Sequence, residues 1–292
     1  MMRSVWPQLR DIAHRLRHQV PADHLMTVSA GLAYYGLFGL LPTLAGAAAL
    51  WAKVGDVGIL EQSAQSGSDS GLVPQDAAEI IKQFVSTVPA NLAGGIGLSL
   101  NLLLVLFAAW RAARTLLTAL NITYDVKEER GLIRRFLIAL VIGAGGMLFL
   151  FAALFVLALP PLLARSPLLE TWMLWARWPV LALAFGLSLA LLFRYGPRRR
   201  GAGWRHVGCG AASATLLWIL GSIGVSFYAR HAGNFGTLYG SLGSIAVVLL
   251  WFWTGAVSVL IGAEIDDVLS PRSKQRDERS LKQRLRHHSR PE

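Results

Sequence analysis

Residues 242–261 read LGSIAVVLLWFWTGAVSVLI, a stretch of twenty positions without a charged side chain. A helix of about 20 predominantly apolar residues is long enough to cross the hydrocarbon core of a bilayer. The rest of the chain agrees with this segment, because 54% of its residues are hydrophobic and only 15% are charged. A soluble domain carries about 25% charged residues. The sequence therefore predicts an integral membrane protein.

Five further apolar segments precede this one. The six predicted spans are about 29–51, 92–110, 136–159, 172–193, 207–228 and 242–261. The fourth reaches a spanning length only if it begins near Trp172, which brings Arg177 to the outer interface, where a long basic side chain can snorkel. We expect an all-α membrane protein, with a six-transmembrane-helix bundle over residues 25–270 and amphipathic interfacial helices.

The basic residues are distributed unevenly between the two sides of these spans. Of the 28 Lys and Arg residues, 23 fall in the N-terminal arm, the connections after the second and fourth spans, and the C-terminal tail. Positive charge accumulates on the cytoplasmic side of membrane proteins. We therefore predict a multi-pass protein of the bacterial inner (plasma) membrane with both termini in the cytoplasm. The net charge of +11 then reflects topology and contact with anionic lipid headgroups, and we expect no nucleic-acid partner.

Segments outside the spans also show patterns. Residues 1–24 predict a cytoplasmic amphipathic arm, because apolar residues recur at helical spacing between basic ones. Residues 77–88, in the largest outer loop, predict a second short amphipathic helix. Residues 271–292 lack apolar periodicity and predict a basic, disordered cytoplasmic tail.

Motifs of enzyme chemistry are absent from the sequence. It contains no HExxH, no Walker loop, no CxxC and no GxSxG. A disulfide within the chain is excluded, because Cys209 is the single cysteine. We predict no catalytic residue, no cofactor and no metal site.

Carboxylates flank the predicted cytoplasmic face in two groups. These are Asp125, Glu128 and Glu129, and Glu264, Asp266 and Asp267. We expect them to pair with the nearby arginines or to face water. The alternative is a divalent metal held for nuclease chemistry.

Four aromatic residues within the spans predict an internal polar pocket. Tyr34 and Tyr35 are adjacent on the first span, and Trp218 and Trp251 fall near the middle of the fifth and sixth. A buried phenol needs a hydrogen-bond partner, and the lipid core offers none. We expect at least one tyrosine hydroxyl to point into the bundle. The alternative is a uniformly packed bundle in which these groups bond only to their neighbours.

Small residues recur at four-residue spacing at Gly236, Gly240 and Ser244. This spacing permits close helix packing or a gating contact. At the end of the sixth span, Glu264 must pair or reach water, and we predict a cytoplasmic ion pair with Arg134 or Arg135. The sequence does not decide whether the protein forms a homo-oligomer.

Three stretches resemble one known family. They are AGLAYYGLFGLLP at 30–42, ALNITYDV at 119–126, and FGTLYGSLG at 235–243 followed by Gly262-Ala-Glu264. They are similar to the first helix, the central motif and the C-terminal motif of the YihY/BrkB membrane proteins, over about residues 25–270. One departure is the pair Asp266-Asp267, where the family often has Asn or Ala after the glutamate.

The resemblance implies six spans and no defined substrate. The family has carried the label ribonuclease BN, which is regarded as a misassignment, and lipid or solute transport has been proposed for it. We expect a transporter or flippase-like protein for an amphipathic envelope molecule. A non-transporting envelope-integrity or scaffold protein is the alternative, and a ribonuclease is the less favoured one.

Overall fold

The computed structural model describes residues 25–51, 95–126, 128, 130–163, 167–197, 203–231 and 241–270, and the isolated positions 65, 68, 75 and 79. These residues form six long helices and no strand. The helices are α2 (Leu25–Trp51), α5 (Gly95–Thr123), α6 (Leu132–Leu163), α7 (Pro167–Tyr195), α8 (Trp204–His231) and α10 (Ser241–Leu269). The predicted all-α fold and the count of six long helices are confirmed within this part of the chain.

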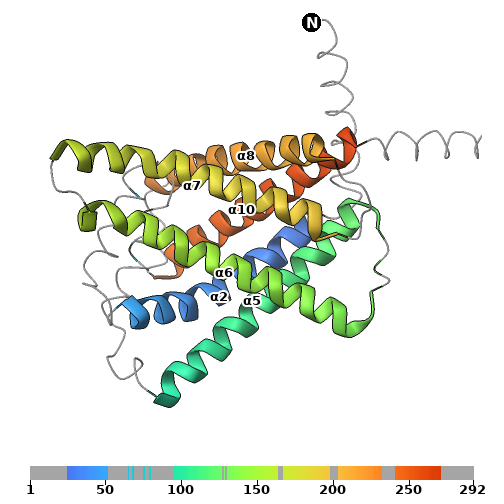
Figure 1. Ribbon diagram of the computed structural model, residues 1–292, viewed down its shortest axis with the longest axis horizontal. Coiled ribbons are helices and arrows are strands. Elements are labelled where there is room, and N and C mark those ends of the chain that lie inside the picture. Colours follow the sequence, from blue (N-terminus) through green and yellow to red (C-terminus); the bar gives the residue numbers. More distant parts are fainter. Residues whose placement is uncertain are drawn as a thin grey trace, which may run out of the picture.

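The six described helices contact one another in a closed ring. Helices that follow one another around this ring run in opposite directions (Figure 1). Around the ring the order is α6, α5, α2, α10, α8 and α7, and α7 returns to α6. The first and last of these helices in the chain, α2 and α10, are therefore neighbours. The helices α5, α7 and α10 finish at one end of the ring, where α6 and α8 begin (right in Figure 1); we call this the polar end.

The buried core lies close to the polar end. Leu120, Phe193, Val207 and Leu260 are fully buried there, and Leu25 at the start of α2 joins the same cluster. Elsewhere, large apolar side chains face outward; among the most exposed are Val141, Leu148, Leu183, Leu216 and Leu220. Exposed apolar area of this kind suits contact with lipid tails, which are as apolar as leucine.

Four helices contain a stretch long and apolar enough to cross a membrane, judged over the described positions. These stretches are Leu103–Thr123, Trp175–Tyr195, His206–His231 and Gly243–Leu269. A shorter apolar stretch, Leu25–Leu40, lies on α2. The predicted interfacial helices at 1–24 and 77–88 and the predicted tail at 271–292 lie outside the described residues, apart from the single position 79.

Two helices extend well past their predicted ends. The sequence places the end of the second span near 110 and the end of the sixth near 261, whereas α5 continues to Thr123 and α10 to Leu269. Residues 108–120 are rich in Ala, Leu and Arg, which are strong helix formers. Arg111 and Arg114 follow the predicted end of the second span at 110 and so fall in the predicted connection, which is wrong, because both lie on α5.

Candidate functional site

The end of α5 is closed by a specific cap. The amide of Val126 donates to the carbonyl of Asn121 at 2.9 Å, and the amide of Asp125 donates to the carbonyl of Ile122 at 2.9 Å. Asp125 has a φ of 47°. This is the Schellman arrangement, in which one residue in the left-handed region reverses the chain and satisfies the last carbonyls. It turns the stretch 119–126 back toward the bundle.

The connection that follows this cap is tied to α5 and α7. The Asn121 side chain donates from Nδ2 to Oε2 of Glu128 at 2.8 Å, and the Arg130 amide donates to the other Glu128 oxygen at 3.2 Å. The Arg130 guanidinium donates from Nη1 to the Gly196 carbonyl at 3.0 Å, just past the end of α7. Its Nε lies 3.9 Å from Glu128 Oε1. Glu128 and Arg130 thus join the second and fourth predicted spans at the polar end.

A buried hydrogen bond joins α10 to the region of this cap. The Tyr124 hydroxyl donates to Oδ2 of Asp266 at 2.9 Å. Tyr124 is 4% exposed, and Glu264 and Asp266 have no exposed area. The last turns of α10 therefore carry their carboxylates inside the bundle. Carboxylates can be buried at a helix end because polar groups from several elements converge there and can bond to them.

Backbone approaches backbone where α8 crosses α10. A Cβ built on Gly210 would lie 2.6 Å from the Gly262 carbonyl oxygen, and one built on Gly262 would lie 2.7 Å from the Gly210 carbonyl oxygen. No side chain larger than hydrogen fits at either position. The helices therefore meet in one register, which places Asp266 beside α8.

A second polar contact lies between α2 and α5. The Arg111 guanidinium donates from Nη2 to the Tyr35 hydroxyl at 3.0 Å, and its central carbon lies 5.3 Å from the centre of that ring. Tyr34 is 57% exposed and stacks on Phe38, and its ring meets that of Tyr35 edge-on, with ring centres 5.5 Å apart. Of the two predicted pocket tyrosines, Tyr35 is the one joined to a neighbouring helix.

The two predicted pocket tryptophans meet inside the ring. The Trp218 and Trp251 ring centres are 6.4 Å apart, and Trp218 also packs on Phe185 of α7 at 4.8 Å. The Trp251 indole donates from Nε1 to Oγ of buried Ser222 at 2.9 Å. This aromatic row fills the space between α7, α8 and α10. Whether Tyr35 and these tryptophans line one pocket stays a prediction.

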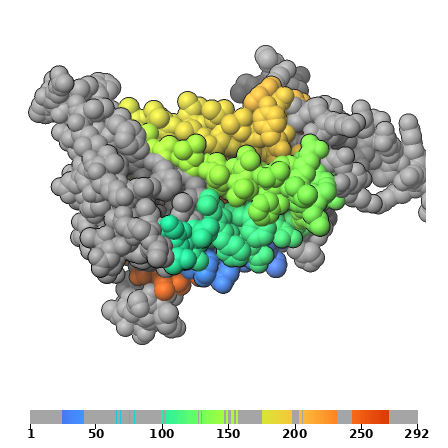
Figure 2. Space-filling model, turned by 60° about the horizontal axis from the view of Figure 1, so that its bottom comes forward, coloured from blue at the N-terminus to red at the C-terminus, as the bar shows by residue number. Residues whose placement is uncertain are grey.

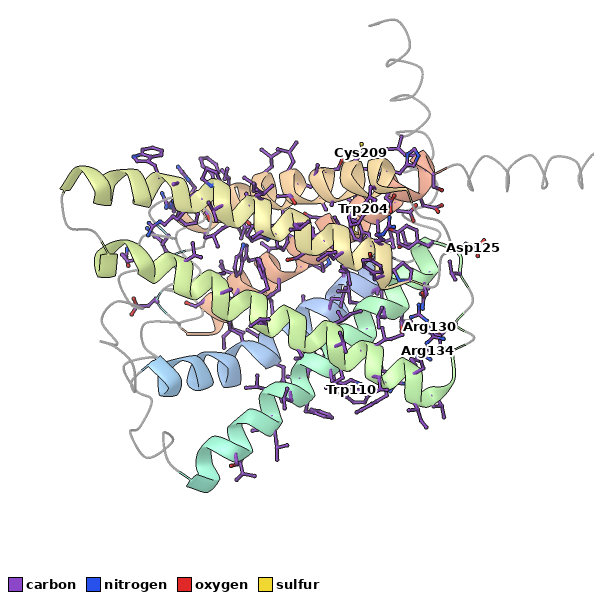
Figure 3. All side chains as sticks on the ribbon, in the orientation of Figure 1. Trp110, Asp125, Arg130, Arg134, Trp204 and Cys209 are labelled. Atoms are coloured by element: carbon purple, nitrogen blue, oxygen red, sulfur yellow. The ribbon has the colours of Figure 1, made fainter. Side chains whose placement is uncertain are left out.

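The remaining predicted residues are spread over the bundle. Gly236 and Gly240 lie outside the described residues, and Ser244 lies in the first turns of α10. Arg134 is exposed at the polar end beside Arg130 (Figure 3). Arg135 donates from Nη2 to Oγ1 of Thr118 at 3.3 Å. The pairing of Glu264 with either arginine stays a prediction.

The carboxylates described at the polar end bond to protein groups. Within the described ranges, no three His, Cys, Asp or Glu side chains are grouped so as to hold a metal ion. Glu128 is engaged by Asn121 and Arg130, and Asp266 accepts a bond from Tyr124. Position 129 is outside the described ranges.

Several contacts between the helices are not predicted by the sequence. Gly210 and Ala214 on α8 are four residues apart, the same spacing as in Gly236, Gly240 and Ser244. Sequence alone does not say which of these small-residue patterns faces a partner helix. A second span that ends at 110 leaves Arg111 in a connection, so the sequence does not predict its bond to Tyr35. The partner of Tyr124 depends on two helices ending beyond their apolar segments.

Comparisons with known proteins agree with the resemblance seen in the sequence. The family model described as virulence factor BrkB matches residues 16–286. The ribonuclease-like protein YfkH of Bacillus subtilis is 29% identical over 264 residues, covering 86% of this chain and 92% of YfkH. A UPF0761 membrane protein of Rhodospirillum centenum is 28% identical over 283 residues, covering 92% of this chain. A UPF0761 membrane protein of Verminephrobacter eiseniae is 26% identical over 257 residues, covering 87% of it.

The chain spans only 60% of the length of each of these two UPF0761 proteins. No solved structure matches the chain.

Proposed function

This chain belongs to the virulence factor BrkB family of membrane proteins, and from that premise we propose that it is a transporter or flippase-like protein. Its substrate is an amphipathic envelope molecule with an anionic headgroup. The observation that carries the proposal is the contact of Arg111 with Tyr35 inside the helical bundle. An ionisable group within a membrane helix bundle marks a substrate or ion path more often than a structural role.

The chemistry of this contact suits an anionic ligand. Arg111 is half-buried between α2 and α5, and its guanidinium contacts the hydroxyl and the ring of Tyr35, which are both uncharged groups. The α5 sequence contains no Asp or Glu. A guanidinium held by neutral partners keeps its charge available, and its planar fork suits a phosphate or carboxylate. An incoming headgroup would gain a charge-assisted bond that Tyr35 does not supply.

The membrane arrangement is part of the same proposal. The helices α2 and α6 have 27 and 32 residues, or about 40 and 48 Å at 1.5 Å per residue, against a hydrocarbon core of about 30 Å. Both are long enough to join the four candidate spans. We place the polar end on the cytoplasmic side of the inner membrane, as the basic residues favour.

Reconstitution into liposomes tests the proposal. With fluorescent phosphatidylglycerol in both leaflets, the wild-type protein should expose the inner-leaflet pool to an external quencher faster than empty vesicles do. Arg111→Gln should lower that rate about tenfold, since one charge-assisted contact is worth about 1.5–3 kcal/mol. Arg194→Gln is the control, because it removes a charge at the same end, on α7. Equal rates for wild type and empty vesicles would refute the proposal for this lipid class.

A scaffold role is the second candidate, and one feature favours it. The backbone contact of Gly210 with Gly262 fixes α8 against α10, and a transporter must let some helices move. A protein without flux for any lipid tested, together with a defective envelope in a deletion strain, would support this candidate.

A further inference from the structure

One stripe of α5 changes from aromatic to basic along its length. Phe107, Trp110, Arg114 and Thr118 follow one another at spacings of three and four residues, which places them on one face of the helix. Phe107 is 53% exposed, and Arg114 and Thr118 are exposed too. The Arg114 guanidinium lies 5.7 Å from the centre of the Trp110 ring. This stripe is on the outside of the ring of helices.

The start of α6 completes this surface. Arg135 donates to Thr118 at 3.3 Å, and Phe136 packs on Trp110 with ring centres 5.4 Å apart. Figure 2 shows α5 and α6 side by side across one face of the molecule. A Cβ built on Gly143 of α6 would lie 2.9 Å from the Ala109 backbone, so the two helices are held in close contact. We call the surface formed by Phe107, Trp110, Arg114, Thr118, Arg135 and Phe136 the basic seam.

The charge of the two helices is of one sign. Neither α5 nor α6 contains an Asp or Glu, and their four basic residues, Arg111, Arg114, Arg134 and Arg135, all lie toward the polar end. The basic seam therefore presents guanidinium groups, and neither helix adds a carboxylate to it. The Thr118 hydroxyl donates to the Arg114 carbonyl at 3.0 Å and helps to position Arg135. The planar fork of each guanidinium suits a phosphate or a carboxylate, and an acidic phospholipid presents a phosphate.

We propose that the basic seam binds an acidic phospholipid. The phosphate bonds to the guanidinium groups of Arg114 and Arg135, and one acyl chain runs along Trp110, Phe136 and Phe107. From Arg114 to Phe107 is seven residues, or about 10 Å along the helix, which matches the change from headgroup to hydrocarbon in a lipid leaflet. A soluble polyanion would use the arginines but gain nothing from the exposed Phe107 ring. The site does not require that the protein transports lipid.

Native mass spectrometry of the full chain in non-ionic detergent tests this site at equilibrium. Titration with phosphatidylglycerol should give bound species at lower lipid concentration than titration with phosphatidylcholine. Arg114→Gln and Arg135→Gln should each weaken phosphatidylglycerol binding about fivefold, since one basic residue near an anionic lipid surface raises the affinity by about this much. Phe107→Ala should also weaken it, although the charge is unchanged.

The control is Arg194→Gln, which removes the same charge at the same end of the bundle. Arg194 also stacks on a tryptophan, since its central carbon lies 4.3 Å from the centre of the Trp204 ring. Unchanged binding in Arg194→Gln, with losses in the three seam variants, supports the site. Equal losses in Arg194→Gln and Arg114→Gln would overturn it, because only the total charge would matter. Unchanged binding in Phe107→Ala, with glycerol phosphate competing as well as the lipid, would overturn the assignment to a lipid.

Discussion

At the scale of the single residue, the bond between Tyr124 and Asp266 has the clearest consequence. The two residues are 142 positions apart, and the hydroxyl-to-carboxylate bond of 2.9 Å is buried. Tyr124→Phe removes the donor and leaves a carboxylate oxygen without that bond. We expect a loss of about 1–3 kcal/mol in the free energy of unfolding, seen as a lower Tm of the purified protein in detergent.

The matched control is Tyr195→Phe. Tyr195 is 63% exposed, so its hydroxyl can exchange a protein partner for solvent at little cost. Its variant should unfold at the wild-type temperature. A Tm for Tyr124→Phe equal to that of Tyr195→Phe would mean that the buried bond contributes nothing to stability.

At the scale of the helix, the contact between α8 and α10 depends on glycine. Gly210→Ala should destabilise the protein by about 1–3 kcal/mol, as overpacked sites do, because the added methyl would lie 2.6 Å from the Gly262 carbonyl oxygen. Gly208→Ala on the same helix has no atom within 4 Å of its added methyl. It should stabilise the helix by about 0.5–1 kcal/mol. Denaturation in detergent measures both variants, and a stable Gly210→Ala variant would show that the helices can separate there freely.

The helices themselves were predictable from the sequence, and their ends were not. Apolar runs of about 20 residues locate the six described helices, because a helix that crosses the hydrocarbon core needs a run of about that length. The runs do not report where a helix stops once it leaves the hydrocarbon. The end of α5 is set by Asp125 in the left-handed region, a cap without glycine that hydropathy does not detect. The polar end is therefore only partly predictable from the sequence. Glu128 pairs with a nearby arginine, Arg130, as expected, whereas the bond of Asp266 to Tyr124 is not predicted.

At the scale of the whole molecule, the topology can be tested directly. The Ser68 carbonyl accepts a bond at 2.8 Å from Arg230 Nη2, in the last turn of α8. Since α8 begins at the polar end, Ser68 lies at the opposite end. Alkaline phosphatase inserted at Ser68 should be active in the periplasm, and the same enzyme fused at Ser289 should be inactive. Activity at Ser289, with a silent Ser68 insertion of equal abundance, would invert the orientation.

The order of the helices around the ring could not be deduced from the sequence. Alternating basic connections predict which helices run in which direction, but they do not say which helix lies beside which. That choice depends on close contacts such as Gly36 against Phe252, where a Cβ on the glycine would lie 2.8 Å from the ring. Small residues occur along all the spans, so their pattern alone allows many arrangements.

The adjacency of α2 and α10 has a consequence for how the protein is made. Translation delivers α2 to the membrane first and α10 last among the described helices, yet α10 packs between α2 and α8. Without α10, the other five described helices would make an open arc, and Tyr124 would have no Asp266 to bond. Closure of the ring therefore awaits the last of the described helices, whatever the order in which the others enter the bilayer.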